Sequence, residues 1–165
     1  MRRILLSIVA VFALCASAFA DEGQLTQHTL RHKGVEYTYW LYLPANLPAD
    51  APLVVVFHGY GSRNIPSLKY GFNALADRNG FAVCYPRGTQ DFRGKHCWDV
   101  GYSFHKEKGW KRDEVGFACR LVRTLQKEYG LSRTNVFATG HSNGGEMCYL
   151  LAYTRPDVFA AVAPV

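Results

Sequence analysis

The sequence lacks the features that mark several large classes of protein. It has no run of five or more basic residues, and its formal net charge of +6 falls to +4 once Arg2 and Arg3 are set aside. We therefore expect no nucleic-acid partner. The apolar stretch at residues 4–15 is shorter than the about 20 residues that span a bilayer. No CxxC pair or histidine-rich spacing indicates zinc, and we expect neither a metal nor an organic cofactor.

The first 20 residues are organised as a secretory signal peptide. Arg2 and Arg3 precede the apolar stretch, and Ala18-Phe19-Ala20 puts small residues at the two positions that a signal peptidase reads. We predict a signal peptide over residues 1–20 and a mature chain over residues 21–165. The predicted location is extracellular or periplasmic, with no stable membrane association after cleavage.

Few cysteines remain in the mature chain. They are Cys84, Cys97, Cys119 and Cys148. An exported chain meets an oxidising environment, so one or two disulfides are expected. Four cysteines allow three pairings, and the sequence does not choose among them. Cys84 and Cys148 stand in apolar surroundings, where buried free thiols are the alternative.

Strands and helices alternate along the rest of the chain. Residues 25–32 and 35–43 are predicted to form a hairpin with its turn at Lys33-Gly34. Continuous apolar runs predict buried strands at 53–57, 81–85, 135–139 and 159–165, and helices are predicted at 66–78, 113–129 and 144–154. Residues 86–111 show no period and predict a long loop. This alternation predicts an α/β fold, a mostly parallel sheet with helices on both faces.

A G-x-S-x-G sequence lies between a predicted strand and a predicted helix, at Gly140-His141-Ser142-Asn143-Gly144. Strand, tight turn and helix are the setting that a nucleophile elbow requires. The glycines let neighbouring backbone approach the turn, and the serine hydroxyl projects at a helix N-terminus. We predict Ser142 as a nucleophile; the alternative is a glycine-rich turn whose serine caps the helix.

Two backbone N–H groups are candidates for stabilising the oxyanion that forms when such a serine attacks a carbonyl. One belongs to Asn143, directly after the serine, and the other to Tyr60, in the His58-Gly59-Tyr60-Gly61 segment after the first buried strand. His58 and His141 are interpreted as structural side chains. Asp113 is interpreted as the N-cap of the helix that follows it.

Six motifs stand in the order found in one esterase family: HGYG, CYPRGTQ, CWDVG, RDEVGF, GHSNGGEMCYLLA and FAAVAPV. From about residue 30 onward the chain resembles the secreted α/β-hydrolase esterases grouped as polyhydroxybutyrate depolymerases and feruloyl or acetylxylan esterases. The resemblance implies Ser142 as the nucleophile and Tyr60 and Asn143 as the oxyanion hole. It also implies an ester substrate, either a polyester or a plant cell-wall polysaccharide ester. Tyr60-Gly61 departs from the Cys-Thr that many relatives carry.

The sequence contains no histidine after Ser142, whereas this fold takes its triad in the order Ser, Asp or Glu, then His. Glu146 and Asp157 follow the serine too closely to be the triad acid. We therefore expect residues 21–165 to be the N-terminal part of a single α/β-hydrolase domain, truncated after the strand that follows the nucleophile helix. The triad acid and histidine are then expected beyond residue 165. We expect the 165-residue chain alone to be inactive.

Aromatic side chains are spread through the predicted long loop. Trp98, Tyr102 and Trp110 are candidates for stacking on a sugar or a phenolic acyl group, and the alternative is that they pack the loop onto the body. Two other functions remain open. One is a secreted serine peptidase of the prolyl-oligopeptidase kind, and the other is a non-catalytic protein that binds a glycan or polymer.

Overall fold

A computed structural model of the chain describes residues 23–62 and 70–165. The predicted signal peptide and the first part of the helix predicted at 66–78 lie outside these residues. The strands are β1 (Gln24–His32), β2 (Val35–Leu43), β3 (Leu53–Phe57), β4 (Ala82–Pro86), β5 (Val136–Gly140) and β6 (Ala161–Pro164). The helices are α2 (Phe72–Asn79), α3 (Ser103–Glu107), α4 (Glu114–Tyr129) and α5 (Asn143–Thr154). No helix in the described ranges is both long and apolar enough to cross a bilayer.

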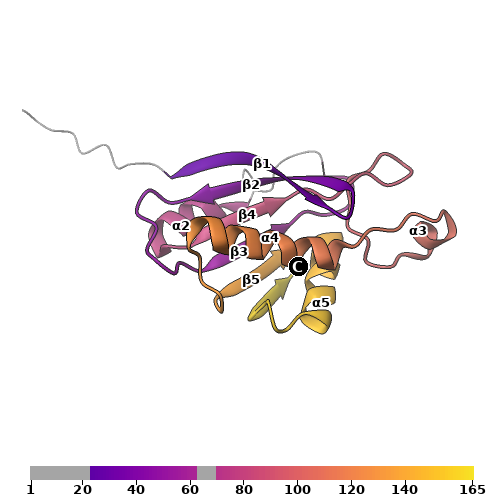
Figure 1. Cartoon of the computed structure of the whole chain (residues 1–165). Coiled ribbons are helices and arrows are strands. Elements are labelled where there is room, and N and C mark those ends of the chain that lie inside the picture. Colours follow the sequence, from indigo (N-terminus) through magenta and orange to yellow (C-terminus); the bar gives the residue numbers. More distant parts are fainter. Residues whose placement is uncertain (1–22, 63–69) are drawn as a thin grey trace, which may run out of the picture.

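The six strands form one sheet in the order β1-β2-β4-β3-β5-β6 (Figure 1). β1 and β2 form the predicted hairpin, with positive φ at Lys33 and Gly34 in its turn. β2 also pairs antiparallel with β4, whereas β4, β3, β5 and β6 run parallel to one another. The predicted mostly parallel sheet is confirmed. The carboxyl ends of β3 and β5 therefore meet at one edge of the sheet.

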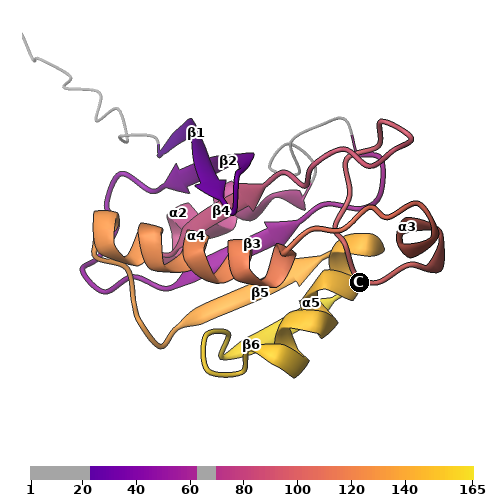
Figure 2. The same cartoon turned by 45° about the vertical axis from the view of Figure 1, so that its right-hand side comes forward.

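Helices cover both faces of the sheet, as predicted. Figure 2 shows α4 and α5 in front of the central strands. Leu53, Val55 and Phe57 of β3 belong to the large core on that face, while the intervening Val56 belongs to a smaller core with Ala76 of α2. This division follows from the strand, in which successive side chains point to opposite faces.

Helix α4 begins and ends where the sequence predicts. Asp113 is the N-cap, and its Oδ1 accepts a hydrogen bond from Gly116 N at 3.1 Å. Gly130 ends the helix in the left-handed region at φ 63°. The side chains buried at helical spacing are Phe117, Leu121 and Leu125. One face of α4 is therefore fixed on the sheet.

The structure corrects two predictions. The loop predicted at 86–111 contains the five-residue helix α3, which is too short to produce a visible period. The expected disulfides are wrong, because all four cysteines in the described part of the chain are free and buried. Cys84 of β4 and Cys148 of α5 lie in the large core as buried free thiols, which was the alternative to a disulfide. Cys119 Sγ accepts a hydrogen bond from Arg155 Nη1 at 2.9 Å.

Candidate active site

Ser142 occupies the sharp turn between β5 and α5. Its φ of 55° and ψ of −120° place a non-glycine residue in a strained region of the backbone map. The turn is held from both sides: Ser142 N donates to Val165 O at 2.7 Å, and Val165 N donates to Gly140 O at 2.9 Å. Ser142 is exposed at the carboxyl edge of the sheet. This is the geometry that a nucleophile elbow requires.

The glycines around Ser142 are required by close packing. A Cβ on Gly144 would lie 2.2 Å from Phe57 O, and one on Gly140 would lie 2.7 Å from the same atom. A Cβ on Gly145 would lie 2.8 Å from Val165 O. These neighbours are backbone atoms, which cannot move aside as a flexible side chain can. The tight approach of α5 to β3 therefore depends on the absence of side chains.

The His58-Gly59-Tyr60-Gly61 segment lies against the elbow. A Cβ on Gly59 would lie 3.2 Å from His141 O and 3.6 Å from Ser142 Cβ. Within the described ranges, no acceptor takes the backbone N–H of Tyr60 or that of Asn143. Both predicted oxyanion donors thus stand on segments next to Ser142 with their N–H groups unused.

His58 is structural, as its sequence context indicated. Its Nε2 accepts from Gly88 N at 3.0 Å, which leaves the proton on Nδ1, 2.8 Å from Gly59 O. Burial lowers the pKa of His58 to about 4, so the ring is neutral near pH 7. Because both ring nitrogens are hydrogen-bonded, His58 has no free nitrogen that could accept the proton of Ser142.

Trp98 joins the segment at residues 58–61 to the turn that holds Ser142. Its indole Nε1 donates to His58 O at 2.9 Å, and its backbone N donates to Asn143 Oδ1 at 2.8 Å. Asn143 Nδ2 returns a hydrogen bond to Trp98 O at 3.2 Å. Both side chains are completely buried. The indole and the amide therefore hold the predicted oxyanion segment (residues 58–61), the 97–99 backbone and the turn at Ser142 in one unit.

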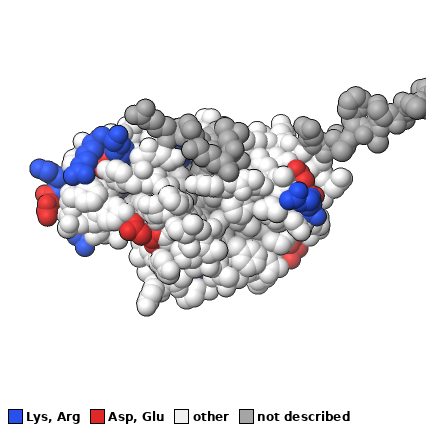
Figure 3. All heavy atoms as spheres, turned by 180° about the vertical axis from the view of Figure 1, so that it is seen from behind, with Lys and Arg blue, Asp and Glu red and all other residues white. Residues whose placement is uncertain are grey.

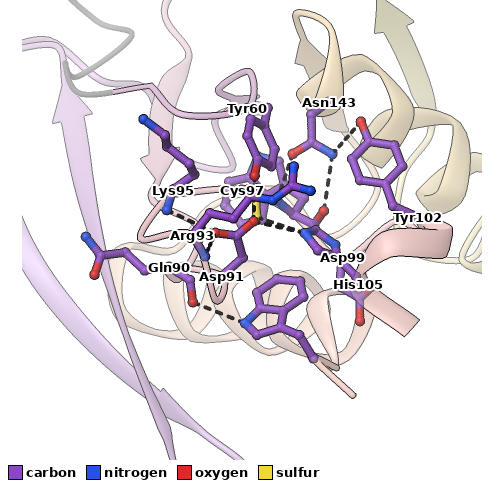
Figure 4. Close-up of polar contacts among 12 residues, drawn as sticks. Tyr60, Gln90, Asp91, Arg93, Lys95, Cys97, Asp99, Tyr102, His105 and Asn143 are labelled. Carbon is purple, nitrogen blue, oxygen red and sulfur yellow. Dashed lines mark hydrogen bonds and ion pairs between the residues drawn. The ribbon is translucent and has the colours of Figure 1, made fainter. Parts of the chain in front are cut away.

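Tyr102, whose hydroxyl faces Asn143 in Figure 4, extends this network to the exposed Glu146. Tyr102 Oη donates a short hydrogen bond to Glu146 Oε2, and Asn143 Nδ2 lies 3.3 Å from Tyr102 Oη. Burial and the bond to Glu146 raise the pKa of Tyr102 to about 12, so its phenol keeps the proton that it donates.

A second polar cluster lies beneath Tyr60 (Figure 4). Asp91 Oδ2 accepts from Tyr60 Oη at 2.6 Å and lies 3.2 Å from His105 Nε2. Asp91 Oδ1 accepts from the backbone N of Arg93 and of Lys95. Burial alone would raise the pKa of Asp91, but these hydrogen bonds outweigh it and lower the pKa to about 2. No motif in the sequence predicts this cluster, because Tyr60, Asp91 and His105 come from three separate segments.

One group of side chains within the described residues has the composition of a metal site. Ligand atoms of Asp91, Cys97 and His105 lie within 4.8 Å of one another. The Asp91 carboxylate already accepts four hydrogen bonds, however, and burial raises the pKa of the Cys97 thiol to about 12. Hydrogen bonding therefore accounts for the cluster.

The three candidate substrate-binding aromatics differ in exposure. Trp98 has no exposed surface, so its ring is closed to a substrate in this structure, whereas Trp110 is 9% exposed and lines an open pocket of about 600 Å³. Trp110 Nε1 donates to Gln90 O at 3.1 Å and its ring lies 4.3 Å from that of His105. Tyr102 is half-buried beside an open pocket of about 390 Å³ that Tyr149 and Tyr153 also line. Of the three candidates, Tyr102 and Trp110 line open pockets, and Tyr102 is the more exposed of the two.

All six histidines of the sequence lie in the described ranges, and none is hydrogen-bonded to Ser142. His105 is buried against Asp91, and His96 Nδ1 is 2.7 Å from Gly88 O. His32 pairs with Asp113 and His28 with Thr26. The described residues therefore place an exposed serine beside two unpaired backbone N–H groups, and none of the six histidines is hydrogen-bonded to that serine.

Comparison with known proteins agrees with this geometry. The model of the family described as esterase PHB depolymerase matches residues 37–164. Feruloyl esterase B of Talaromyces stipitatus is 30% identical over 75% of this chain and 34% of its own length. Poly(3-hydroxyalkanoate) depolymerase C of Paucimonas lemoignei is 29% identical over 75% of this chain and 30% of its own length. The chain thus spans about a third of the length of these relatives.

A solved structure shows the same fold. The acetyl xylan esterase from Aspergillus awamori superposes with a TM-score of 0.65 at 30% identity, covering 87% of this chain and 53% of that one. The predicted α/β-hydrolase fold, present in part, is confirmed. Because the family model matches residues 37–164, the chain belongs to the esterase PHB depolymerase family.

Proposed function

We propose that the protein is an exported serine esterase that forms an acyl-enzyme on Ser142. The observation that carries the proposal is the strained Ser142 backbone, at φ 55° between a buried strand and a helix, with an exposed side chain. A strained, exposed serine at the carboxyl edge of a parallel sheet is what nucleophilic acyl transfer needs. The family membership supports the same chemistry.

The proposed reaction has two steps. Ser142 Oγ attacks the ester carbonyl carbon while its proton passes to a general base, and the carbonyl oxygen becomes an oxyanion. The N–H groups of Tyr60 and Asn143 donate to that oxyanion, and losing one such donor costs about 10²–10³ in rate. Collapse expels the alcohol, which takes the proton. Water then attacks the acyl-enzyme, the carboxylic acid leaves, and the proton returns to Ser142.

The general base in this proposal is a histidine other than the six in this sequence, oriented by an acid. The placement of those six supports it: His58 has both ring nitrogens occupied, and His105 has no exposed surface. His141 precedes the nucleophile directly and belongs to the elbow itself. A base from elsewhere in the protein would approach Ser142 from its exposed side.

The relatives' names guide the proposed substrate. They are feruloyl esterases, acetylxylan esterases and poly(3-hydroxyalkanoate) depolymerases. We propose a polyester or a plant cell-wall polysaccharide ester as the substrate, met outside the cytoplasm. The predicted signal peptide at residues 1–20 supports export.

The test uses the protein produced from its natural reading frame. Aryl esters and peptide amides are offered side by side, and a fluorophosphonate probe reports the nucleophile. Ester hydrolysis should fall by about 10⁴-fold or more in Ser142→Ala, with loss of probe labelling, while the exposed-serine control Ser103→Ala keeps both. Faster cleavage of amides would favour a peptidase, and labelling that survives Ser142→Ala would refute the assigned nucleophile.

A further inference from the structure

The segment over residues 87–112 is rich in positive charge that no ion pair neutralises. It holds seven Lys or Arg and three Asp or Glu. None of its Lys or Arg side chains belongs to an ion pair within residues 23–62 and 70–165. Figure 3 shows Lys and Arg gathered at the end of the molecule that carries this segment. This is also the end at which Ser142 lies.

Two of these cations are held in a fixed turn beside the oxyanion segment. Asp91 Oδ1 accepts from Arg93 N at 2.8 Å and from Lys95 N at 3.0 Å, and Gly94 N donates to Asp91 O at 3.0 Å. The other oxygen of the same carboxylate binds Tyr60 Oη. One buried carboxylate thus positions Arg93, Lys95 and Tyr60 relative to one another (Figure 4).

The two side chains flank Tyr60. Lys95 Cδ lies 3.6 Å from where a Cβ on Gly61 would stand, and Gly61 N donates to His96 O at 2.8 Å. The Arg93 guanidinium lies 4.7 Å from the centre of the Phe104 ring, which meets the Tyr60 ring edge to face. Arg93 and Lys95 are themselves exposed. Both cations therefore lie at the surface beside residues 59–61. Gly59 of that segment packs against Ser142.

The nearby acidic groups form no ion pair with Arg93 or Lys95 in the described structure. Asp91 lies beneath the turn and is 6% exposed, with both oxygens engaged in four hydrogen bonds. Asp99 accepts from Gly101 N and Arg112 N, and Glu146 accepts from Tyr102. Glu107, on α3, is the remaining acid of the segment. Exposed cations without acidic partners attract anions over about a Debye length.

We propose that Arg93 and Lys95 form a subsite for a carboxylate that the ester substrate carries close to its scissile bond. The inference rests on the proposed function and specifies its substrate class. Arginine binds a carboxylate through its planar fork, and lysine adds a point charge. The exposed ring of Phe92, 5.2 Å from the Arg93 guanidinium, adds an apolar surface for the body of the ligand. Such a carboxylate occurs on the uronate units of an acidic polysaccharide and at the free end of a polyester chain.

Binding tests the subsite independently of turnover. In the full protein carrying Ser142→Ala, which prevents hydrolysis, trigalacturonate and a 3-hydroxybutyrate trimer are titrated, each against its neutral methyl ester. We expect the acids to bind more tightly than the esters, and the preference to shrink between about 0.02 M and about 0.3 M salt. Arg93→Gln/Lys95→Gln should weaken binding of the acid by about fivefold or more.

The matched control removes the same charge elsewhere. Arg120 and Arg123 line another basic groove, on α4, so Arg120→Gln/Arg123→Gln should leave the affinity unchanged. Loss of binding in this control, or no loss in Arg93→Gln/Lys95→Gln, would overturn the subsite. The acid that binds more tightly identifies the source of the carboxylate. Turnover is then measured in protein with Ser142 intact, on esters with and without a free carboxylate. Equal turnover of the two kinds of ester refutes the subsite alone. No turnover of either kind refutes the proposed function.

Discussion

The side-chain amide of Asn143 binds both polar backbone atoms of Trp98. Its Oδ1 accepts from Trp98 N at 2.8 Å, and its Nδ2 donates to Trp98 O at 3.2 Å. Asn143 directly follows the proposed nucleophile, and Trp98 lies in a loop 45 residues earlier in the chain. The residue that would supply an oxyanion N–H therefore also fixes the loop that holds the other oxyanion segment.

Replacing this amide should lower both stability and activity. Asn143→Ala leaves the buried Trp98 N without an acceptor and Trp98 O with only the hydrogen bond from Val100 N, which costs about 1–3 kcal/mol of unfolding free energy. Chemical denaturation measures the loss, and aryl ester hydrolysis should fall as the loop shifts. Asn73→Ala is the control, because Asn73 accepts a hydrogen bond from Tyr85 Oη at 2.6 Å on the opposite face of the sheet. It should lose stability and keep kcat; equal kcat loss in both variants would contradict a local role.

The indole of Trp98 should matter through its hydrogen bond to His58 O. Trp98→Phe removes that donor and leaves a buried carbonyl unpaired. We expect kcat to fall about tenfold, because small displacements of positioning groups are costly, with little change in KM. Trp40→Phe, on β2, removes the same atoms from a partly buried position that packs in the smaller core. If Trp40→Phe lowers kcat equally, the loss comes from a general decrease in packing of the fold, and the positioning role of Trp98 is wrong.

Much of this site could be predicted because its signals are local in sequence. The apolar run before Gly140 and the helix after Ser142 identify the elbow, and Asp113 followed by helical spacing identifies an N-cap. The place of Trp98 could not be predicted in the same way. Whether a loop aromatic is buried depends on partners such as His58 and Asn143, which lie 40 and 45 residues away. The cysteines show the same limit, since export suggests disulfides but only the packing decides whether two thiols meet.

Gly144, two residues after Ser142, should tolerate no side chain. In Gly144→Ala the new Cβ would lie 2.2 Å from Phe57 O and 2.8 Å from His58 O. The expected loss is about 3 kcal/mol or more, despite the better helix propensity of alanine. Gly130→Ala is the comparison, since Gly130 has φ 63° and no atom within 4 Å of the added Cβ. It should lose only about 1 kcal/mol, from the left-handed backbone. Equal losses in denaturation would show that close packing at Gly144 is unimportant.

The buried cysteines should remain unreactive thiols in the folded protein. Burial raises the pKa of Cys148 to about 12 and also raises the pKa of Cys84 and Cys119, so little thiolate is present near pH 7. Protein purified without reductant should show no disulfide among the described cysteines by mass spectrometry. A thiol reagent should label these four only after denaturant is added. A disulfide-linked peptide pair in the native digest would contradict the arrangement.

Glu114 should make stability fall as the pH rises. The side chain is 1% exposed, and the Tyr37 hydroxyl and the Asp99 backbone N–H, which face its carboxyl, lower the pKa less than burial raises it. Burial raises its pKa from 4.5 to about 8. Between these values the folded protein keeps the proton and the unfolded chain releases it. The contribution to stability is therefore complete below pH 4.5 and declines by about 3 kcal/mol by pH 7.

A substitution that cannot ionise should abolish this decline. Glu114→Gln has nearly the same shape, so its unfolding free energy should match that of the native protein near pH 4.5 and exceed it by about 3 kcal/mol at pH 7. Denaturation curves recorded across this range measure the difference. Glu128→Gln, at an exposed position of the same helix, should follow the native protein throughout. Parallel curves for Glu114→Gln and the native protein would mean that the buried carboxyl finds a stabilising partner for its charge.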